Sequence, residues 1–331
     1  MIKIGINGFG RIGRMVFRAA VQNFSQDVEI VGINDLLEPD YLAYMLKFDS
    51  VHGRFKGDVS TEGTSLIVNG KKIRLTAVKD PSTLKWDEVG ADIVVESTGL
   101  FLDHASAEAH LKAGAKKVIM SAPSKDETPM FVYGVNHASY AGQTIISNAS
   151  CTTNCLAPLV KVLDENFGIL HGFASTVHSY TNDQNLHDAP HKDLRRARAA
   201  AYSIIPTTTN AGKALDRILP TLAGKIEASA MRVPVPDGSL TDLIVTVGKE
   251  VTTREVNDAF KKAAALDLKG YLQIESDPIV SMDILGNSHS AILDEALTST
   301  KGNLVKVVAW YDNESGYANR LVDLAKKISY N

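Results

Sequence analysis

Two cysteines could carry covalent chemistry in this chain, and they are its only cysteines. Cys151 and Cys155 lie four residues apart in the stretch SNASCTTNC (147–155). Ser150 is a favourable N-cap residue, which predicts a helix that begins at Cys151. A helix N-terminus favours an anion, so we expect the pKa of the Cys151 thiol to fall and the thiolate to act as a nucleophile. Cys155 lies one turn further along and is predicted to be a small core residue.

Other uses of the cysteine pair fit its spacing less well. Residues four apart in a helix have Cβ atoms roughly 5–6 Å apart, beyond the ~3.8 Å of a disulfide. A metal site is disfavoured because no second pair of ligands follows at a recognisable spacing. We therefore predict two reduced thiols and no metal.

A glycine motif near the N-terminus predicts a dinucleotide site. Gly8, Gly10 and Gly13 form a G-x-G-x-x-G pattern between the apolar run IKIGI (2–6) and a helical pattern that starts at Arg11. Such glycines permit a tight turn, close approach of the backbone to a pyrophosphate, and close packing of helix on strand. Asp35 follows the next apolar run and is suited to a ribose hydroxyl, which favours NAD over NADP. The alternative interpretation is that the glycines form an ordinary turn and that Asp35 is a turn or N-cap residue.

His178 is the best candidate for a base among nine histidines, because it ends an apolar run and begins the polar stretch HSYTNDQ (178–184). A histidine at the end of a strand is often structural, and a Cys/His couple also serves cysteine hydrolases. A hydrolase, however, has no use for a dinucleotide site. A nucleophilic thiol combined with a nicotinamide cofactor indicates oxidation of an aldehyde through a thioester.

Several cationic and hydroxyl residues could bind phosphate. The stretch HKDLRRARAAA (191–201) carries four cations, PTTT (206–209) and CTT (151–153) supply hydroxyls, and MRVP (231–234) contains Arg232. A phosphorylated small substrate would explain these groups. A solvated helix face would equally explain the cations, and turn or cap chemistry the threonines.

Composition limits the class of protein. The 331 residues are 44% hydrophobic and 22% charged, as in a soluble globular protein of two domains. A net charge of −3 offers no overall attraction for nucleic acid or an anionic membrane. No apolar run approaches the ~20 residues of a membrane span, and the N-terminus lacks the features of a signal peptide. We expect a cytoplasmic protein.

The elements that must position these residues fall into two groups. Uniformly apolar runs alternate with helical patterns in the first half, which predicts a Rossmann-type, doubly wound α/β domain with a parallel sheet: strands 2–6, 28–33, 92–97, 117–121 and 144–148, and helices 11–23, 39–47 and 104–114. A hairpin at 65–76, turning on Asn69 and Gly70, is predicted to be an inserted excursion.

The second half has longer, alternating strands, which predict an α+β domain with a mostly antiparallel sheet: strands 171–180, 230–235, 241–250 and 304–312, and helices 151–168, 253–266 and 317–329. The predicted domains are a dinucleotide-binding domain over 1–150, completed by the C-terminal helix 316–331, and a catalytic domain over 151–315.

Taken together, these stretches resemble the family of phosphorylating glyceraldehyde-3-phosphate dehydrogenases, essentially end to end. The resemblance is carried by INGFGRIGR (6–14), NDL (34–36), YMLKFDSVHGRF (44–55), STGLF (97–101), SAPSKD (121–126), SNASCTTNCLAPL (147–159), TVHSYTNDQ (176–184), PHKDLRRARAAA (190–201), MRVP (231–234) and WYDNESGYANR (310–320). It implies a cytoplasmic, NAD-dependent enzyme of glycolysis and gluconeogenesis that forms a homotetramer, takes glyceraldehyde 3-phosphate and inorganic phosphate, and has no dedicated nucleic-acid or membrane partner.

The resemblance also implies roles for individual residues. Cys151 attacks the aldehyde, and His178 acts as the base and stabilises the oxyanion together with the Cys151 backbone N–H. Further roles carried over are cofactor contacts at Gly8, Gly10, Arg11, Ile12, Gly13, Asp35, Lys79, Ser97, Ser121 and Asn313; a substrate phosphate site at Thr181, Asp183 and Arg232; and an inorganic phosphate site at Ser150, Thr152, Arg196, Thr209 and Asn210.

Three departures from the family pattern bear on phosphate binding and on the cofactor. Asn210 stands where glycine is usual, which suggests a backbone of positive φ. Asp237, in VPVPDGS (233–239), lies close in sequence to Arg232, and Lys79 stands where arginine is common. A sister enzyme that oxidises erythrose 4-phosphate, and a non-catalytic nucleotide- or RNA-binding protein, are the alternative interpretations.

Overall fold

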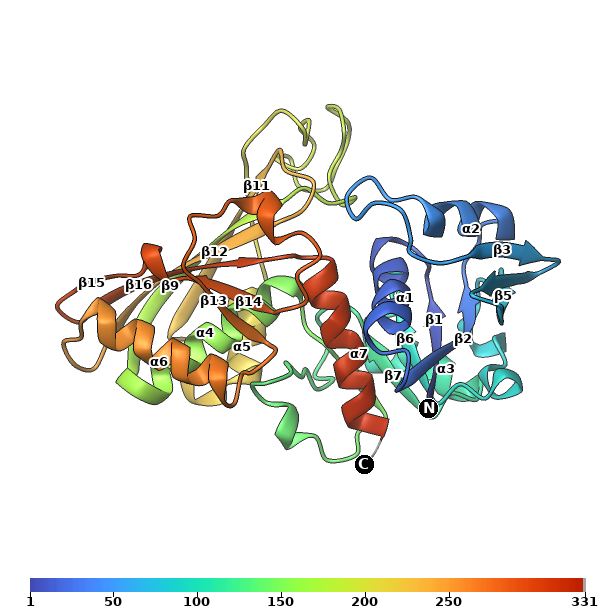
Figure 1. Ribbon diagram of the computed structural model, residues 1–331, viewed down its shortest axis with the longest axis horizontal. Helices are drawn as coiled ribbons and strands as arrows, with labels where there is room; N and C mark the ends of the chain where they lie inside the picture. Colours follow the sequence, from blue (N-terminus) through green and yellow to red (C-terminus); the bar gives the residue numbers. More distant parts are fainter. Residues whose placement is uncertain (330–331) are drawn as a thin grey trace. The chain divides into compact units, whose positions relative to one another are not determined.

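The computed structural model describes residues 1–329 and divides into two units, each built on its own sheet (Figure 1). The first unit comprises Met1–Phe131, His137–Ala149 and the described chain from Ala318 onward, and the second comprises Val132–Asn136 and Ser150–Tyr317. The predicted C-terminal helix ran to residue 331, and its last two residues lie outside the described part. The predicted fold class, a Rossmann-type domain plus a domain with a mostly antiparallel sheet, is confirmed.

Sheet A, in the first unit, is built on six parallel strands. They are β1 (Ile2–Asn7), β2 (Val28–Asn34), β5 (Lys71–Thr76), β6 (Ile93–Glu96), β7 (Lys117–Met120) and β8 (Ile145–Ser147), and the full order is β3-β4-β5-β2-β1-β6-β7-β8. Strands β1, β6, β7 and β8 are almost wholly buried, as a sheet covered on both faces requires, whereas β5 carries both exposed and buried residues.

The carboxyl ends of four parallel strands align in register. Asn7 lies opposite Asn34 on one side and Glu96 on the other, and Asn34 lies opposite Thr76. The turns that follow these strands therefore emerge together at one edge of the sheet, where ligands bind in doubly wound folds. This edge carries the glycine motif.

The hairpin of β4 (Ser65–Val68) and β5 turns on Asn69 and Gly70, both with positive φ, as expected. Its interpretation as an inserted excursion is wrong, because β5 pairs in parallel with β2 and the hairpin extends sheet A. Strand β3 (Val59–Glu62), which the sequence patterns missed, pairs with β4 at the edge. The helices are α1 (Arg11–Asn23), α2 (Pro39–Lys47) and α3 (His104–Lys112), close to the predicted bounds.

Sheet B, in the second unit, is mixed and mostly antiparallel. Its strands are β9 (Ile169–Ser179), β10 (Ile205–Thr207), β11 (Ile226–Val233), β12 (Ser239–Val247), β13 (Leu272–Glu275), β14 (Ala291–Asp294), β15 (Ser299–Lys301) and β16 (Leu304–Tyr311). Their order is β10-β11-β9-β12-β16-β14-β13, and β15 pairs with β16. The short strands β10, β13, β14 and β15 were not predicted, since three or four residues carry too little periodicity.

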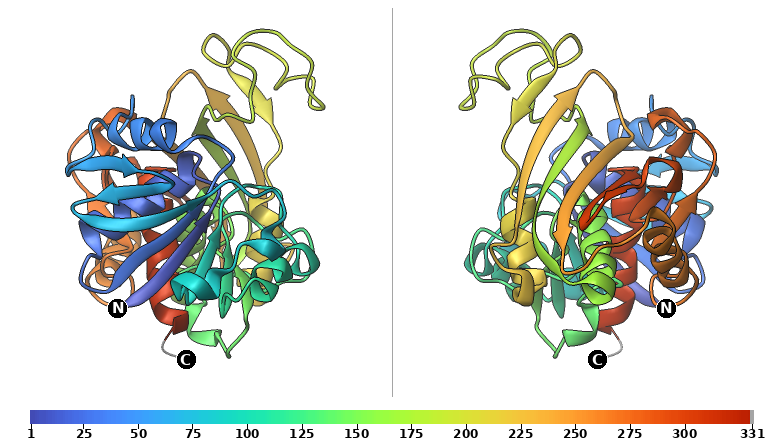
Figure 2. Two further views of the ribbon diagram at one scale, coloured as in Figure 1. Left: turned by 90° about the vertical axis from the view of Figure 1, so that its right-hand side faces the viewer. Right: turned by 90° about the vertical axis from the view of Figure 1, so that its left-hand side faces the viewer.

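Three helices lie against sheet B and contact its strands: α4 (Cys151–Phe167), α5 (Ala211–Ile218) and α6 (Thr253–Ala265) (Figure 1). Helix α5 was not predicted. A long segment between β9 and β10 carries the cationic stretch and extends beyond the end of the sheet (Figure 2). Helix α7 (Ser315–Ser329) belongs to the first unit from Ala318 onward. None of the helices within residues 1–329 has the length and apolar character to cross a membrane.

Candidate active site

Cys151 is the first residue of helix α4, as the sequence pattern predicted. Ser150 caps the helix, because its hydroxyl oxygen accepts the backbone N–H of Thr153 at 3.1 Å. The Cys151 side chain is partly exposed, whereas Cys155 is fully buried. Burial raises the pKa of the Cys155 thiol to about 12, which makes it an inert core residue.

His178, near the end of β9, faces the Cys151 thiol. Its Nε2 lies 3.4 Å from Cys151 Sγ, so residues 27 positions apart meet in one hydrogen-bonded pair. Its Nδ1 lies 2.7 Å from the carbonyl oxygen of Ser179, which can only accept. We therefore assign the ring proton to Nδ1, and Nε2 then presents its lone pair to the thiol.

The protonation states differ from the sequence prediction. Burial raises the pKa of the Cys151 thiol, and the Arg232 charge and the Thr152 backbone N–H only partly oppose this effect. The expected fall in the thiol pKa is thus wrong, because packing around the sulfur outweighs the helix N-terminus. Burial, reinforced by the Arg232 charge, lowers the pKa of His178 to about 3. The pair is accordingly a neutral thiol beside a neutral imidazole.

Arg232, on β11, connects the base to the region predicted to bind phosphate. Its Nη1 donates to the Ser179 carbonyl oxygen at 2.9 Å and lies 3.4 Å from Thr181 Oγ1. Nη1 also lies 2.8 Å from His178 Nδ1, and because the ring proton is assigned to Nδ1, this is a close approach of two protonated nitrogens and not a hydrogen bond. Its buried Nε has no hydrogen-bond partner, and no carboxylate of residues 1–329 forms an ion pair with it. A mostly buried guanidinium without a carboxylate is suited to an anionic ligand.

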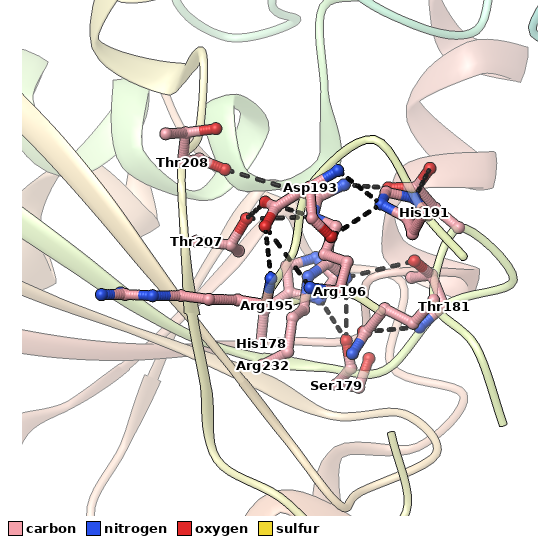
Figure 3. A network of polar contacts seen from close by, with 12 residues as sticks. His178, Ser179, Thr181, His191, Asp193, Arg195, Arg196, Thr207, Thr208 and Arg232 are labelled. Atoms are coloured by element: carbon pink, nitrogen blue, oxygen red, sulfur yellow. Dashed lines mark hydrogen bonds and ion pairs between the residues drawn. The ribbon is translucent and has the colours of Figure 1, made fainter. Parts of the chain in front are cut away.

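Arg196 and Asp183 form an ion pair within the segment between β9 and β10. Arg196 Nε also donates to Thr207 Oγ1 at 3.0 Å, and Nη2 reaches the Thr208 carbonyl oxygen at 3.4 Å. The structure therefore brings together two residues that were assigned to different phosphate sites. Figure 3 shows Arg196, Thr207 and Thr208 beside His178 and Arg232.

The remaining predicted phosphate ligands differ in their surroundings. The Thr152 hydroxyl is buried and lies 3.0 Å from the hydroxyl of Tyr311, while Thr209 Oγ1 accepts the Ala211 N–H at 3.2 Å. Asn210 is the N-cap of α5 with φ −90°, so the expectation of positive φ is wrong: a helix start needs no left-handed residue. Asp237 is fully buried and accepts the N–H of Gly238 at 2.8 Å.

Asn313, which follows β16, is held by two serines. Its Oδ1 accepts the hydroxyls of Ser179 at 2.9 Å and Ser239 at 2.7 Å. Two donors on this oxygen fix the orientation of the amide and leave its NH₂ as the donor end. Sequence reasoning missed these serines.

Tyr311 is a second missed residue. Its hydroxyl lies 2.7 Å from Thr176 Oγ1, and its ring packs edge-on against His178 with centroids 5.9 Å apart. The apolar residues Val305, Val307 and Ala309 stand at alternate positions before Tyr311 on β16, and this spacing could have indicated that Tyr311 faces inward.

The glycine motif has the geometry that a dinucleotide requires. Gly8 has φ +90°, and a Cβ on Gly13 would lie 2.1 Å from the Gly8 carbonyl oxygen. A Cβ on Gly10 would meet no atom within 4 Å, which leaves open space at the start of α1. No side chain caps that helix, and its first turn has no acidic residue. These features fit a pyrophosphate at the helix N-terminus.

The other predicted cofactor residues of the first unit lie in the turns that follow its strands or in the first turn of α1. Asp35 Oδ2 accepts the Phe9 N–H at 2.7 Å, so the acidic group contacts the glycine turn directly. Ser97 Oγ lies 2.7 Å from the Gly8 carbonyl oxygen, and the Ser121 N–H donates to the Glu96 carbonyl oxygen at 2.9 Å. Lys79 is exposed. Arg11 forms an ion pair with Asp49, and Ile12 lies in the first turn of α1.

Comparisons with known proteins agree with this geometry. Residues 2–104 match the family model described as glyceraldehyde 3-phosphate dehydrogenase, NAD binding domain, and residues 150–313 match the C-terminal domain of the same enzyme. A glyceraldehyde-3-phosphate dehydrogenase of Bacteroides fragilis is 59% identical over 331 residues, 99% of both chains. Relatives of the same name from Priestia megaterium (56% identical) and Escherichia coli K12 (A form, 54% identical) align with 99% of this chain and with 98% and 99% of their own lengths.

Proposed function

The chain belongs to the glyceraldehyde-3-phosphate dehydrogenase family, and on that premise we propose that it oxidises glyceraldehyde 3-phosphate with NAD and inorganic phosphate to 1,3-bisphosphoglycerate, a reaction of glycolysis and gluconeogenesis. The observation that carries the proposal is the contact of Cys151 Sγ with His178 Nε2 at 3.4 Å, beside the guanidinium of Arg232, whose buried Nε has no hydrogen-bond partner. A thiol, a base and an anion site together suit a phosphorylated aldehyde.

Cys151 and His178 perform the covalent chemistry. The thiol proton moves to His178 Nε2 while Sγ forms a bond to the aldehyde carbon, so the neutral pair becomes a thiohemiacetal oxyanion and an imidazolium. The Cys151 backbone N–H and the new Nε2–H stabilise the oxyanion. The imidazolium keeps the proton taken from the thiol, so its positive charge balances the negative charge of the oxyanion. Bound NAD supplies the chemistry of hydride acceptance.

Loss of hydride from the former aldehyde carbon lets the oxyanion collapse to a carbonyl, and the acyl group stays on Cys151 Sγ as a thioester. Inorganic phosphate attacks the thioester carbon, the C–S bond breaks, and the acyl phosphate departs. The thiolate released takes back the proton held on His178 Nε2, and the starting pair is restored. His178, in its neutral form at the start, is in the correct protonation state to accept the first proton.

We assign the two phosphates to neighbouring groups of the second unit. Arg232, Thr181 and Asp183 bind the substrate phosphate, and the inorganic phosphate takes Ser150, Thr152, Arg196, Thr209 and Asn210. The Arg196–Asp183 ion pair supports closely spaced sites, because an incoming phosphate can replace the carboxylate at the guanidinium.

We assign NAD to the first unit as the dinucleotide-binding domain, completed by the C-terminal helix, with Asn313 of the catalytic domain contributing its amide. Gly8, Gly10, Arg11, Ile12 and Gly13 hold the pyrophosphate at the start of α1, and Asp35 accepts from the adenosine ribose. The remaining contacts are assigned to Lys79, Ser97 and Ser121.

We further infer a cytoplasmic homotetramer. The segment between β9 and β10 exposes large apolar side chains at Leu186 (71% exposed), Leu194 (83%) and Tyr202 (88%). Such residues favour burial against another subunit. The tetramer is tested by the mass of the chain in solution, for which a monomer would be contrary to the proposal.

The reaction is tested by following NADH formation from glyceraldehyde 3-phosphate while the phosphate concentration is varied. We expect turnover to depend on phosphate, and indifference to phosphate would contradict the mechanism. Erythrose 4-phosphate in a parallel assay tests the sister activity, which we expect to be the slower one because the relatives above are all named glyceraldehyde-3-phosphate dehydrogenase. RNA affinity without any dehydrogenase activity would favour the non-catalytic alternative.

A further inference from the structure

A row of polar side chains, of which three are buried and Thr76 is half-buried, lies beneath the edge of sheet A that carries the glycine motif. Thr76, Asn34, Asn7 and Glu96 lie in register across four parallel strands. Thr76 Oγ1 donates to Asn34 Oδ1 at 2.9 Å, Asn34 Nδ2 donates to Asn7 Oδ1 at 2.8 Å, and Asn7 Nδ2 donates to Glu96 Oε2 at 2.6 Å. Glu96 is fully buried and ends the row.

His110 and Trp86 complete the row behind Glu96. The Trp86 indole N–H donates to His110 Nδ1 at 3.1 Å, so that nitrogen carries no proton, and the proton resides on Nε2. His110 Nε2 then donates to Glu96 Oε2 at 2.9 Å. Trp86 is held in place because its ring packs on Gly5, where a Cβ would lie 2.7 Å from the ring. The imidazole orientation is thus determined by packing.

The other carboxylate oxygen of Glu96 holds the turn that follows β6. Glu96 Oε1 accepts the Thr98 backbone N–H at 2.7 Å and also the Thr98 hydroxyl. Thr98 Oγ1 in turn accepts the Leu100 N–H at 3.1 Å. A Cβ on Gly8 would lie 2.8 Å from the Thr98 nitrogen, so the glycine turn packs directly on this backbone.

The opposite end of the row holds a second turn. Asn34 Nδ2 donates to the Val78 carbonyl oxygen at 2.9 Å, and Asn34 Oδ1 accepts the Val78 N–H at 2.9 Å. Val78 precedes Lys79, a proposed cofactor residue. One continuous set of hydrogen bonds therefore connects the turns on both sides of the glycine motif. A carboxylate can only accept hydrogen bonds, and each hydrogen-bond partner of the Glu96 carboxylate described above is a donor. A neutral amide of the same shape would place its NH₂ group against these donors, so glutamine cannot replace Glu96 without loss of hydrogen bonds.

We propose that Glu96 is a positioning residue for dinucleotide binding, which holds the turn at Thr98 and, through Asn7 and Asn34, the turn at Val78 against the glycine motif. The inference rests on the assignment of NAD to this edge. Glu96 acts through these neighbours, and its contribution is to preorganise the loops that NAD contacts.

The test is a calorimetric titration of NAD into the full-length Glu96→Gln variant. In the variant, the new NH₂ group faces other donors, and we expect the Kd for NAD to rise about tenfold or more, as for loss of a charged hydrogen-bond partner. The rate of Cys151 alkylation by iodoacetamide is expected to stay unchanged. A Kd equal to that of the unsubstituted chain would overturn the proposal, whereas failure of the unsubstituted chain to bind NAD would overturn the proposed function itself.

Two further variants separate positioning from general stability. Val118→Ala removes buried apolar contacts on β7 of the same sheet, and it should lower the Tm without changing the Kd for NAD. The double variant Asn7→Asp with Glu96→Gln moves the acceptor to the neighbouring strand, where His110 Nε2 lies 3.5 Å from the atom replaced. We expect it to bind NAD more tightly than Glu96→Gln alone, and binding that is no tighter would contradict the proposal.

A milder substitution keeps the test decisive if Glu96→Gln does not fold. Thr98→Val removes only a partly exposed hydroxyl that donates to Glu96. The Kd for NAD should rise several-fold, as expected for one hydrogen bond. An unchanged Kd in this folded variant would also overturn the proposal.

Discussion

The carbonyl oxygen of Ser179 lies 2.7 Å from His178 Nδ1 and thereby orients the imidazole of the candidate base. Arg232 donates to the same oxygen at 2.9 Å, which its two lone pairs allow. The guanidinium consequently lies beside the ring and opposes its protonation, in agreement with a His178 pKa of about 3. One backbone carbonyl thus connects the base with the residue proposed to bind the substrate phosphate.

The two cysteines should differ completely in function. Cys151→Ser is expected to lower kcat on the order of 10³-fold or more, because a hydroxyl in place of the thiol is a far weaker nucleophile. Cys155→Ser, at a site that contacts no proposed ligand, should remain active and lose only stability. Steady-state rates together with NAD titrations check this. Equal loss of activity in both variants would refute the division of labour.

Arg232 should contribute most when the substrate carries a phosphate. Arg232→Gln is expected to raise the KM for glyceraldehyde 3-phosphate about 10- to 100-fold, as for one or two charge-assisted hydrogen bonds. The effect on unphosphorylated glyceraldehyde should be much smaller. Arg195→Gln is the matched control, because this neighbouring arginine is exposed. A similar penalty on both aldehydes would argue against a phosphate role.

Asp35 should determine the choice of cofactor. Asp35→Gly removes a carboxylate that repels a 2′-phosphate, so the ratio of specificity constants for NADP over NAD should rise about tenfold or more. The Phe9 N–H also loses its acceptor, so binding of NAD should weaken. Kinetics with each cofactor measure both effects, and an unchanged ratio would exclude Asp35 as the discriminating group.

Asp126 should stabilise the first unit at neutral pH, and this contribution should be lost in acid. Hydrogen bonds from the Thr128 side chain and from the backbone N–H groups of His104 and Thr128, which together outweigh the opposing effect of burial, lower its pKa to about 2. A lowered pKa in the folded state means that the stabilisation is complete above pH ~4, the range of an unfolded aspartate, and is lost as the pH falls towards 2.

Comparison of Asp126→Asn with the unsubstituted chain checks this dependence. The difference in free energy of unfolding, about 1 kcal/mol after allowance for solvent screening, should be constant from pH 7 to 5. It should shrink below pH 4, with unfolding of the first unit followed by the fluorescence of the buried Trp86. A difference that grows on acidification would have the wrong sign.

Features that depend on adjacent residues could be predicted from the sequence. The start of α1 after the glycine motif, the Ser150 cap and the start of α4 at Cys151 follow from local propensity and capping, and each occurs at the predicted residue. The fold class followed from the change of periodicity between the two halves. Short strands were missed because three or four residues carry little periodicity.

Features that depend on distant residues were decided by the tertiary structure. The thiol pKa rises because burial of the sulfur by residues distant in sequence outweighs the helix N-terminus, which was the only contribution visible in the sequence. The meeting of Arg232 with Ser179, and of Glu96 with Asn7, joins residues more than 50 positions apart. The sequence by itself determined which chemical groups are present and where helices begin; which groups touch, and hence their protonation and their role, depends on strand order and packing.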